Sequence, residues 1–196
     1  GVMRGLVAQA DILSQGYRPQ AIARLGFSPE EAASINPGIV YVTLSAYGHA
    51  GPWADRRGFD SLVQTTTGFN HAEGQAAGIE GPKELPAQML DHATGYLMAF
   101  GAMMAKARQA REGGSWHVRV SLAQTGRWLW NLGRLDDGLN TPDLAVEAIH
   151  AAFMETVSSG FGTLTAVRHS AALSKTPARW SRPAMPLGSH PPQWPS

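Results

Sequence analysis

Cysteine and long apolar runs are the clearest absences from this sequence of 196 residues. The lack of cysteine excludes disulfides and thiolate metal sites, and it fits a reducing compartment. No apolar run approaches the roughly 20 residues that a membrane-spanning helix needs, and the first residues lack the pattern of a secretory signal. We therefore expect a cytoplasmic protein that does not act at a membrane.

A strong excess of either charge is also absent. The chain has 16 Lys and Arg against 15 Asp and Glu, which gives a formal charge of +1. Nucleic-acid-binding domains normally carry a basic face, so this balance gives no support to a nucleic-acid partner. The hydrophobic content of 43% is ordinary for a globular protein and is sufficient for a sizeable core.

Several common active-site motifs are missing too. The chain has neither a phosphate-binding Gly-x-x-x-x-Gly-Lys-Ser/Thr loop nor a Gly-x-Ser-x-Gly elbow. No His, Asp and Glu residues have the spacing of metal ligands, so we predict no metal site. The histidines occur singly, and we expect each to be solvated or hydrogen-bonded: His49, His71, His92, His117, His150, His169 and His190.

What the sequence does contain is an alternation of short strands and helices. Residues 39–45 form the best strand, because their nearly continuous apolar, β-branched character suits a parallel strand covered on both faces. Ser28, Pro29 and Glu31 have the capping-box pattern of a helix start. The pattern predicts strands at 11–14, 39–45, 116–121 and 163–167, with helices at 4–9, 20–25, from Ser28 to the turn at 36–38, 59–69, between Pro86 and Gly113, 122–132 and 170–174.

This order predicts an α/β fold, in which an open parallel sheet is connected by crossover helices. Residues 70–86 contain three glycines and two prolines and are predicted to be a loop. The six prolines between Thr176 and Ser196 predict an extended C-terminal tail.

Asp91 lies at the start of the longest helical pattern in the chain. From local pattern alone it is predicted to be an N-cap, because Asp accepts hydrogen bonds from the free amides of a first helical turn. A helix terminus that fixes a capping carboxylate also holds a reactive carboxylate still, so a capping role and a catalytic role are compatible.

Seven short motifs follow one another in a fixed order. They are Gln-Gly-Tyr-Arg-Pro at 15–19 with Arg-Leu-Gly at 24–26, Asn-Pro-Gly-Ile-Val-Tyr at 36–41, Gly-x-x-Gly-Pro at 48–52, Arg-Gly-Phe-Asp at 57–60, Gly68, Asp-x-x-x-Gly at 91–95, and Gly-Gly-Ser-Trp-His-Val at 113–118 leading into Val-Ser-Leu at 120–122. In this order the chain resembles the family III CoA-transferases, which include formyl-CoA and carnitine CoA-transferases and are related to α-methylacyl-CoA racemase. The resemblance runs from about residue 6 to 132 and resumes near 164, where 176–180 and 186–188 are similar to the closing segment of that family.

The resemblance implies a partial Rossmann-like sheet and a covalent nucleophile at Asp91. It implies that CoA or an acyl-CoA binds as substrate and contacts Gly16, Tyr17, Ala21, Arg24, Arg57 and Phe59. Without the resemblance, Arg24 and Arg57 are ordinary solvated charges and Tyr17 is a partly buried anchor. Racemases of the family carry a histidine where this chain has Phe59, which has no proton to give or accept, so the transferase branch is favoured.

The resemblance also implies a longer protein. Family members have about twice this length and form interlocked homodimers, so we expect a homodimer. The implied domain organisation is a CoA-transferase large-domain core at 1–133 without its first strand and helix, a connecting arm at 134–162 in place of the small domain, and a segment at 163–196 that returns to the large domain.

Three functions follow from the sequence. The first is transfer of CoA between an acyl-CoA and a carboxylic acid through Asp91. The second is an acyl-CoA racemase-like reaction, which Phe59 disfavours. The third is a non-catalytic CoA-binding fragment or subunit that needs a partner chain.

Overall fold

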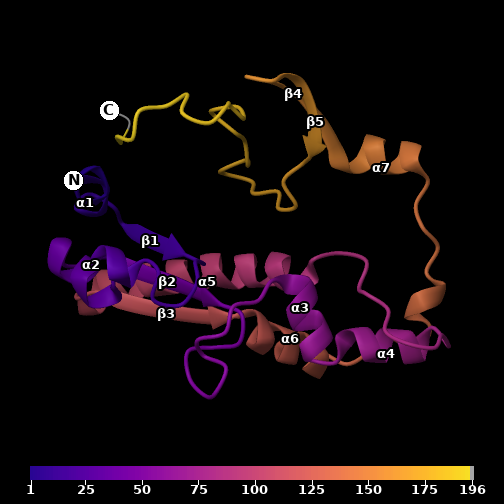
Figure 1. Ribbon diagram of the computed structural model, residues 1–196. Helices are drawn as coiled ribbons and strands as arrows, with labels where there is room; N and C mark the ends of the chain where they lie inside the picture. The colour runs from indigo at the N-terminus through magenta and orange to yellow at the C-terminus, as the bar shows by residue number, and fades with distance from the viewer. Residues whose placement is uncertain (195–196) are drawn as a thin grey trace. The chain divides into compact units, whose positions relative to one another are not determined.

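A parallel sheet of three strands is the centre of the first part of the chain (Figure 1). The computed structural model describes residues 1–194 and divides into two units, Gly1–Leu139 and Asn140–Ser196. The first unit contains α1 (Val2–Val7), β1 (Ile12–Gln15), a 3-10 turn (Ala23–Leu25), α2 (Pro29–Ile35), β2 (Val40–Ser45), α3 (Asp60–Thr66), α4 (Phe69–Ala76), α5 (Met89–Glu112), β3 (Trp116–Ser121) and α6 (Leu122–Asn131).

The strands are ordered β1-β2-β3, and both pairings are parallel. Val40 of the central strand lies opposite Ile12 on one side and Trp116 on the other. Because consecutive parallel strands need a crossover, α2 connects β1 to β2, and α3, α4 and α5 lie between β2 and β3 in the chain. The predicted α/β fold with an open parallel sheet and crossover helices is confirmed.

Different helices cover the two faces of β2, as its continuous apolar sequence predicts. One buried cluster joins α1, α2 and the sheet through Val7, Ala10, Ala32, Ile39 and Tyr41. The other joins α5 and the sheet through Val40, Val42, Ala102 and Ala105. A third cluster lies where β2 ends and holds the start of α5 against α3 and α6, through Ala46, Val63, Leu90 and Leu122.

The local signal at Ser28 is confirmed in full. Its side chain accepts a hydrogen bond from the Glu31 amide at 3.2 Å, and the Glu31 carboxylate accepts one from the Ser28 amide at 2.8 Å. The helix predicted at 20–25 is shorter than expected, since only residues 23–25 form a 3-10 turn, which Gly26 ends with a positive φ.

The loop predicted at 70–86 is wrong in its first half, where α4 forms. The prediction treated Gly74 as a helix breaker, but its backbone is helical and buried. A Cβ added at Gly74 would lie 2.1 Å from the Gly81 carbonyl oxygen, so glycine is there because the following segment crosses closely over the helix.

The second unit consists of α7 (Val146–Phe153), β4 (Met154–Ser159), β5 (Gly162–Val167) and an irregular tail. The strand predicted at 163–167 is confirmed, and it pairs antiparallel with β4 in a separate two-stranded sheet. The stretch predicted as a connecting arm therefore contains a helix and a strand, while the predicted domain limits stay a prediction. No helix forms at 170–174, because so few residues do not repay the cost of nucleating one.

Between residues 168 and 194 the tail has no helix or strand, as its prolines predict. Among the described helices, none combines the length and apolar character that crossing a bilayer requires.

Candidate functional site

A pocket of about 230 Å³ opens at the carboxyl ends of β1 and β2 in the first unit. This is the edge of a parallel sheet at which α/β proteins bind ligands. Its walls come from the loop after β1, the end of β2, the segment before α3, the first turn of α5 and the first residue of α6. The lining residues are Gly16, Tyr17, Arg18, Pro19, Leu44, Ser45, Ala46, Arg56, Arg57, Gly58, Phe59, Asp91 and Leu122.

The loop after β1 brings Gly16 and Tyr17 to the pocket. The Tyr17 amide donates to the Gln15 side-chain oxygen at 3.0 Å, which fixes the turn out of the strand. Gly16 lies against Leu44 of the neighbouring strand, since a Cβ added there would be 3.4 Å from a Leu44 methyl group. The Tyr17 side chain is 67% exposed and free to contact a ligand.

The segment before α3 brings Arg57 and Phe59 to the same pocket. Between them, Gly58 lies so close to the end of β2 that a Cβ would meet Ala46 at 3.0 Å and the Tyr47 ring at 3.2 Å. Phe59 has extended backbone just before the helix, and its ring is 80% exposed. Glycine at 58 thus permits the close approach that presents its two neighbours at the rim.

Asp91 occupies the third position of α5, so the prediction that it is the N-cap is wrong. Gln88 is the N-cap and makes no side-chain capping bond. The helix begins two residues before Asp91, at Met89. The fully buried Leu90 side chain anchors this first turn in the core. The free amide of Asp91 instead donates to the carboxylate of Asp60, on α3, at 2.8 Å.

Asp60 is a buried carboxylate that fixes the start of α5 from another helix. It is 1% exposed, and its second oxygen accepts a short hydrogen bond from the Gln64 amide group. Gln64 also donates to the Ala87 carbonyl at 3.1 Å and accepts from the Leu85 amide at 3.3 Å. The segment that enters α5 is therefore held on both sides of its backbone.

The electrostatics of Asp91 follow from this arrangement. Partial burial raises the pKa of its carboxyl group, the negative charge of Asp60 raises it further, and His92 acts in the opposite direction. The Asp91 side chain is nevertheless exposed at the pocket, so a ligand reaches it from solvent. It is a carboxylate held by its backbone, with a higher proton affinity than an ordinary aspartate.

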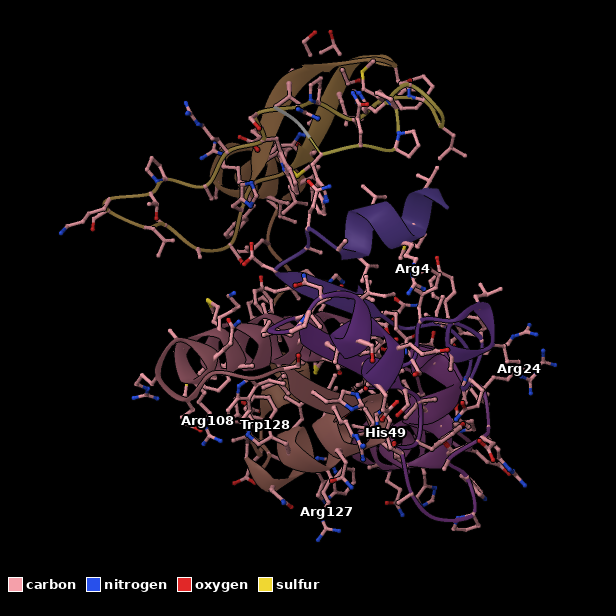
Figure 2. All side chains as sticks on the ribbon, turned by 90° about the vertical axis from the view of Figure 1, so that its left-hand side faces the viewer. Arg4, Arg24, His49, Arg108, Arg127 and Trp128 are labelled. Carbon is pink, nitrogen blue, oxygen red and sulfur yellow. The ribbon has the colours of Figure 1, made fainter. Side chains whose placement is uncertain are left out.

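Of the predicted site residues, Gly16, Tyr17, Arg57, Phe59 and Asp91 line this one pocket. Ala21 and Arg24 do not line it. Arg24 belongs to the 3-10 turn and extends outward from the unit (Figure 2). The functional roles of all seven stay predictions.

Four further residues of this site were not predicted. Arg18 and Arg56 line the pocket, and Asp60 and Gln64 hold Asp91. Asp60 and Gln64 are four residues apart and so share one helix face, which is a signal the sequence contains. Nothing in the sequence shows that this face meets a helix 31 residues further along the chain.

No histidine lines this pocket within the described residues, and His92 is exposed beside Asp91. In the described part of the chain, no three His, Cys, Asp or Glu side chains gather in a way that could hold a metal ion. The pocket therefore offers one carboxylate, three guanidinium groups and two aromatic rings.

Comparison with known proteins gives a consistent result. The sequence model of CoA-transferase family III matches residues 1–142. The chain is 30% identical over 156 residues to a probable fatty acyl-CoA transferase of Mycobacterium tuberculosis, which covers 74% of this chain and 38% of that protein. It is 35% identical over 118 residues to the acetyl-CoA:oxalate CoA-transferase of Acetobacter aceti, which covers 60% of this chain and 30% of that protein.

Among solved structures, the fold is similar to that of a CAIB/BAIF family protein from Brucella suis. The TM-score is 0.62 at 22% sequence identity, and the match covers 83% of this chain and 43% of that one. The chain therefore spans less than half the length of these relatives.

Proposed function

Because the chain belongs to CoA-transferase family III, we propose that it transfers CoA from an acyl-CoA thioester to a carboxylic acid, with Asp91 as the covalent nucleophile. The single observation that carries the proposal is the pocket in which Asp91 lies with Tyr17 and Arg57. The relatives from Mycobacterium tuberculosis and Acetobacter aceti carry transferase names, and the reaction of this chain is inferred from the site.

The first half of the reaction moves CoA onto the protein. An oxygen of the Asp91 carboxylate attacks the thioester carbonyl, so that a C–O bond forms, the C–S bond breaks and CoA leaves as its thiolate. The thiolate then attacks the aspartyl carbonyl of this mixed anhydride. A C–S bond forms, the anhydride C–O bond breaks, and the donor leaves as a free carboxylate.

The second half reverses these steps with a new acid. The acceptor carboxylate attacks the aspartyl-CoA carbonyl and expels the thiolate, and the thiolate attacks the acceptor carbonyl of the new anhydride. This releases the new acyl-CoA and regenerates the Asp91 carboxylate. No water is consumed, so the activation of the thioester is kept.

The charges at the pocket suit an anionic substrate of this kind. Arg18, Arg56 and Arg57 all line it, and guanidinium groups form paired, charge-assisted hydrogen bonds with phosphate and carboxylate oxygens. Arg56 also lies over the Trp53 ring at 4.7 Å, which orients its side chain. We assign CoA phosphates to Arg57, and contacts with the rest of CoA to Gly16, Tyr17 and Phe59.

Within this proposal, a racemase-like reaction is disfavoured by the lining of the pocket. Racemisation at an α-carbon needs groups that remove and return a proton. Asp91 is one such group, but Phe59 is not, and no histidine lines the pocket in the described residues. Transfer needs only the carboxylate.

Hydroxylamine trapping tests the proposal. After incubation with an acyl-CoA, hydroxylamine should convert the activated Asp91 carbonyl into a hydroxamate, which peptide mass spectrometry locates. The Asp91→Asn variant should give no product, whereas Asp55→Asn, which removes an exposed carboxylate outside the pocket, should react as the unaltered chain does. An Asp91 that stays unmodified while the chain binds CoA would instead indicate a non-catalytic CoA-binding protein.

A further inference from the structure

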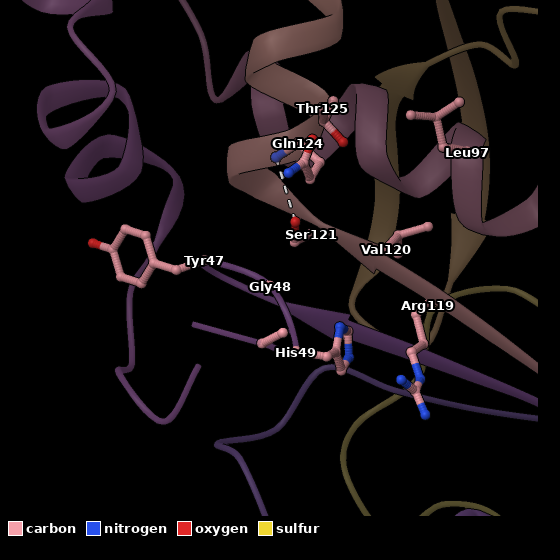
Figure 3. Close-up of a pocket in the computed structure, with 10 residues that line it drawn as sticks. Tyr47, Gly48, His49, Leu97, Arg119, Val120, Ser121, Gln124 and Thr125 are labelled. Atoms are coloured by element: carbon pink, nitrogen blue, oxygen red, sulfur yellow. Dashed lines mark hydrogen bonds between the residues drawn. The ribbon is translucent and has the colours of Figure 1, made fainter. Parts of the chain in front are cut away.

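A second cavity, of about 360 Å³, lies beside the edge strand β3 (Figure 3). It is open to solvent and is lined by the loop 47–50, the carboxyl end of β3, the first turns of α6 and Leu97 of α5. It shares no lining residue with the pocket that contains Asp91. The reaction proposed above gives it no role.

Hydrogen bonds among Arg119, His117, Thr43 and His49 determine which nitrogen of the His49 ring carries a proton. The Arg119 Nε–H donates to Nδ1 of His117 at 3.4 Å, so the proton of the His117 ring is on Nε2, 3.0 Å from the Thr43 hydroxyl oxygen. The Thr43 hydroxyl can then donate to Nε2 of His49, which at 3.0 Å is the nearer of its two acceptors, the other being the Val118 carbonyl at 3.4 Å. This leaves His49 protonated at Nδ1, with that N–H unused.

The surroundings favour the neutral form of both rings. Burial lowers the pKa of His49 and of His117, and the charge of Arg119 lowers both further. Glu30 of α2 and His49 also act on the pKa of His117, Glu30 raising it and His49 lowering it. A cationic side chain thus lies close to two imidazoles whose neutral form is favoured.

Arg119 has unused donors as well. In residues 1–194 the only hydrogen bond of its side chain is the one from Nε, and it forms no ion pair, although Glu30 is near enough to interact with it electrostatically. The Arg119 Nη groups and the His49 Nδ1–H are therefore donors without acceptors. The Gln124 side chain, which also lines the cavity, can supply another N–H.

We propose that this cavity binds a small oxyanion, a carboxylate or a phosphate, through the Arg119 guanidinium group and the Nδ1–H of His49. A guanidinium group presents two parallel N–H donors that match the two oxygens of either anion. The neutral imidazole adds a donor without bringing an acceptor to the ligand. The positive charge of Arg119 at the cavity disfavours a metal cation there.

The site is independent of the transferase proposal. It shares no residue with the pocket of Asp91. A chain without CoA-transfer activity could therefore still bind the anion here, and a chain that does not bind the anion could still transfer CoA.

Titration of the whole chain with succinate and with phosphate, followed by nuclear magnetic resonance, tests the proposal. Sodium chloride keeps the ionic strength constant. The His49 ring signals and the Arg119 Nε–H signal should shift together and saturate with one dissociation constant. Arg119→Gln should weaken binding on the order of tenfold, as expected when a charge-assisted pair is lost.

Arg127→Gln is the matched control, because it removes another exposed guanidinium, from α6 outside this cavity (Figure 2). It should leave the dissociation constant unchanged. His49→Gln, in an exposed loop, gives a second variant that should also weaken binding without disturbing the fold.

Saturation by succinate alone identifies a carboxylate site, and saturation by phosphate alone identifies a phosphate site. Either result supports the proposal. Shifts that rise linearly with both anions, or an Arg127→Gln variant that loses as much affinity as Arg119→Gln, would overturn it.

Discussion

The carboxylate of Asp60 does for α5 what a capping side chain does for its own helix, although it belongs to α3. It accepts the amide of Asp91, and its own orientation is fixed by Gln64. Its negative charge also raises the pKa of the Asp91 carboxyl group, after burial, which has the larger effect. One buried residue therefore controls both the position and the proton affinity of the proposed nucleophile.

The Asp60→Asn variant tests this control. It should lower the rate of CoA transfer about tenfold to a hundredfold, because small displacements of a reacting group have costs of that size. Asp91 must be ionised to attack, so its raised pKa causes activity to fall off at a higher pH than for an ordinary aspartate. Removing the charge of Asp60 lowers that pKa and should move this acid limb of the pH–rate profile to lower pH.

A rate loss without a shift of the acid limb would show that Asp60 supports the fold alone. Thermal unfolding of the same variant is the control for stability. Asparagine keeps one acceptor oxygen for the Asp91 amide but turns an NH2 group towards the Gln64 donor, so the loss in stability should be about 1–3 kcal/mol.

Arg57 and Arg24 are both predicted to bind CoA, but only Arg57 lines the pocket. Arg57→Gln should raise KM for acyl-CoA on the order of tenfold with little change in kcat, since a phosphate contact made throughout the reaction affects binding alone. Arg24→Gln should have a smaller effect. Steady-state kinetics on both variants give the comparison, and a larger effect at Arg24 would contradict this view of the pocket.

Helix α5 connects the sheet to the site, and its two inner glycines differ in their surroundings. A Cβ added at Gly101 would lie 2.7 Å from a methyl group of Val118 on β3, whereas one added at Gly95 would have no neighbour within 4 Å. The close approach at Gly101 lets the helix lie directly on the strand.

This difference gives a prediction for the helix as an element. Gly101→Ala should destabilise the chain by about 1 kcal/mol, because overpacking costs about 1–3 kcal/mol and the better helix propensity of alanine returns up to about 1 kcal/mol. Gly95→Ala should stabilise it by about 0.5–1 kcal/mol. Urea unfolding measures both, and a Gly101→Ala variant as stable as Gly95→Ala would show that α5 does not pack on β3 as closely as described.

Features set by neighbouring residues were predictable from the sequence. The capping box at Ser28 and the strand at 116–121 depend on residues close along the chain, and both are confirmed. The α4 helix and the cap at Asp91 were wrongly predicted for one reason. Each involves a contact beyond a single helical turn, since the Gly81 carbonyl crosses over Gly74 and Asp60 accepts the amide of Asp91.

In the candidate site, too, some residues could be predicted from the sequence and others could not. The resemblance to the family supplied Tyr17, Arg57 and Asp91, which meet at one pocket. Physical reasoning from the sequence alone gave no route to Arg18 or Arg56, because a solvated arginine and one that lines a pocket have the same local pattern.

At the scale of the whole molecule, the predicted homodimer gives a further test. Tyr96, Phe100 and Met103 follow one another at helical spacing on α5, and each is more than half exposed. An exposed apolar stripe of this kind is typical of a protein interface. Sedimentation analysis should show a dimer, and Phe100→Glu should shift it to monomer. A monomeric unaltered chain would contradict the prediction, and a dimeric variant would assign the interface to another face.

The central claim is that Asp91 becomes covalently attached to CoA, and intact-protein mass spectrometry after mixing with an acyl-CoA tests it most directly. We predict that the chain gains the mass of CoA less one water, that digestion places this adduct on the peptide containing Asp91, and that adding a carboxylic acid removes it. A chain that turns over acyl-CoA without any adduct at Asp91, or that forms the same adduct after Asp91→Asn, would contradict the claim.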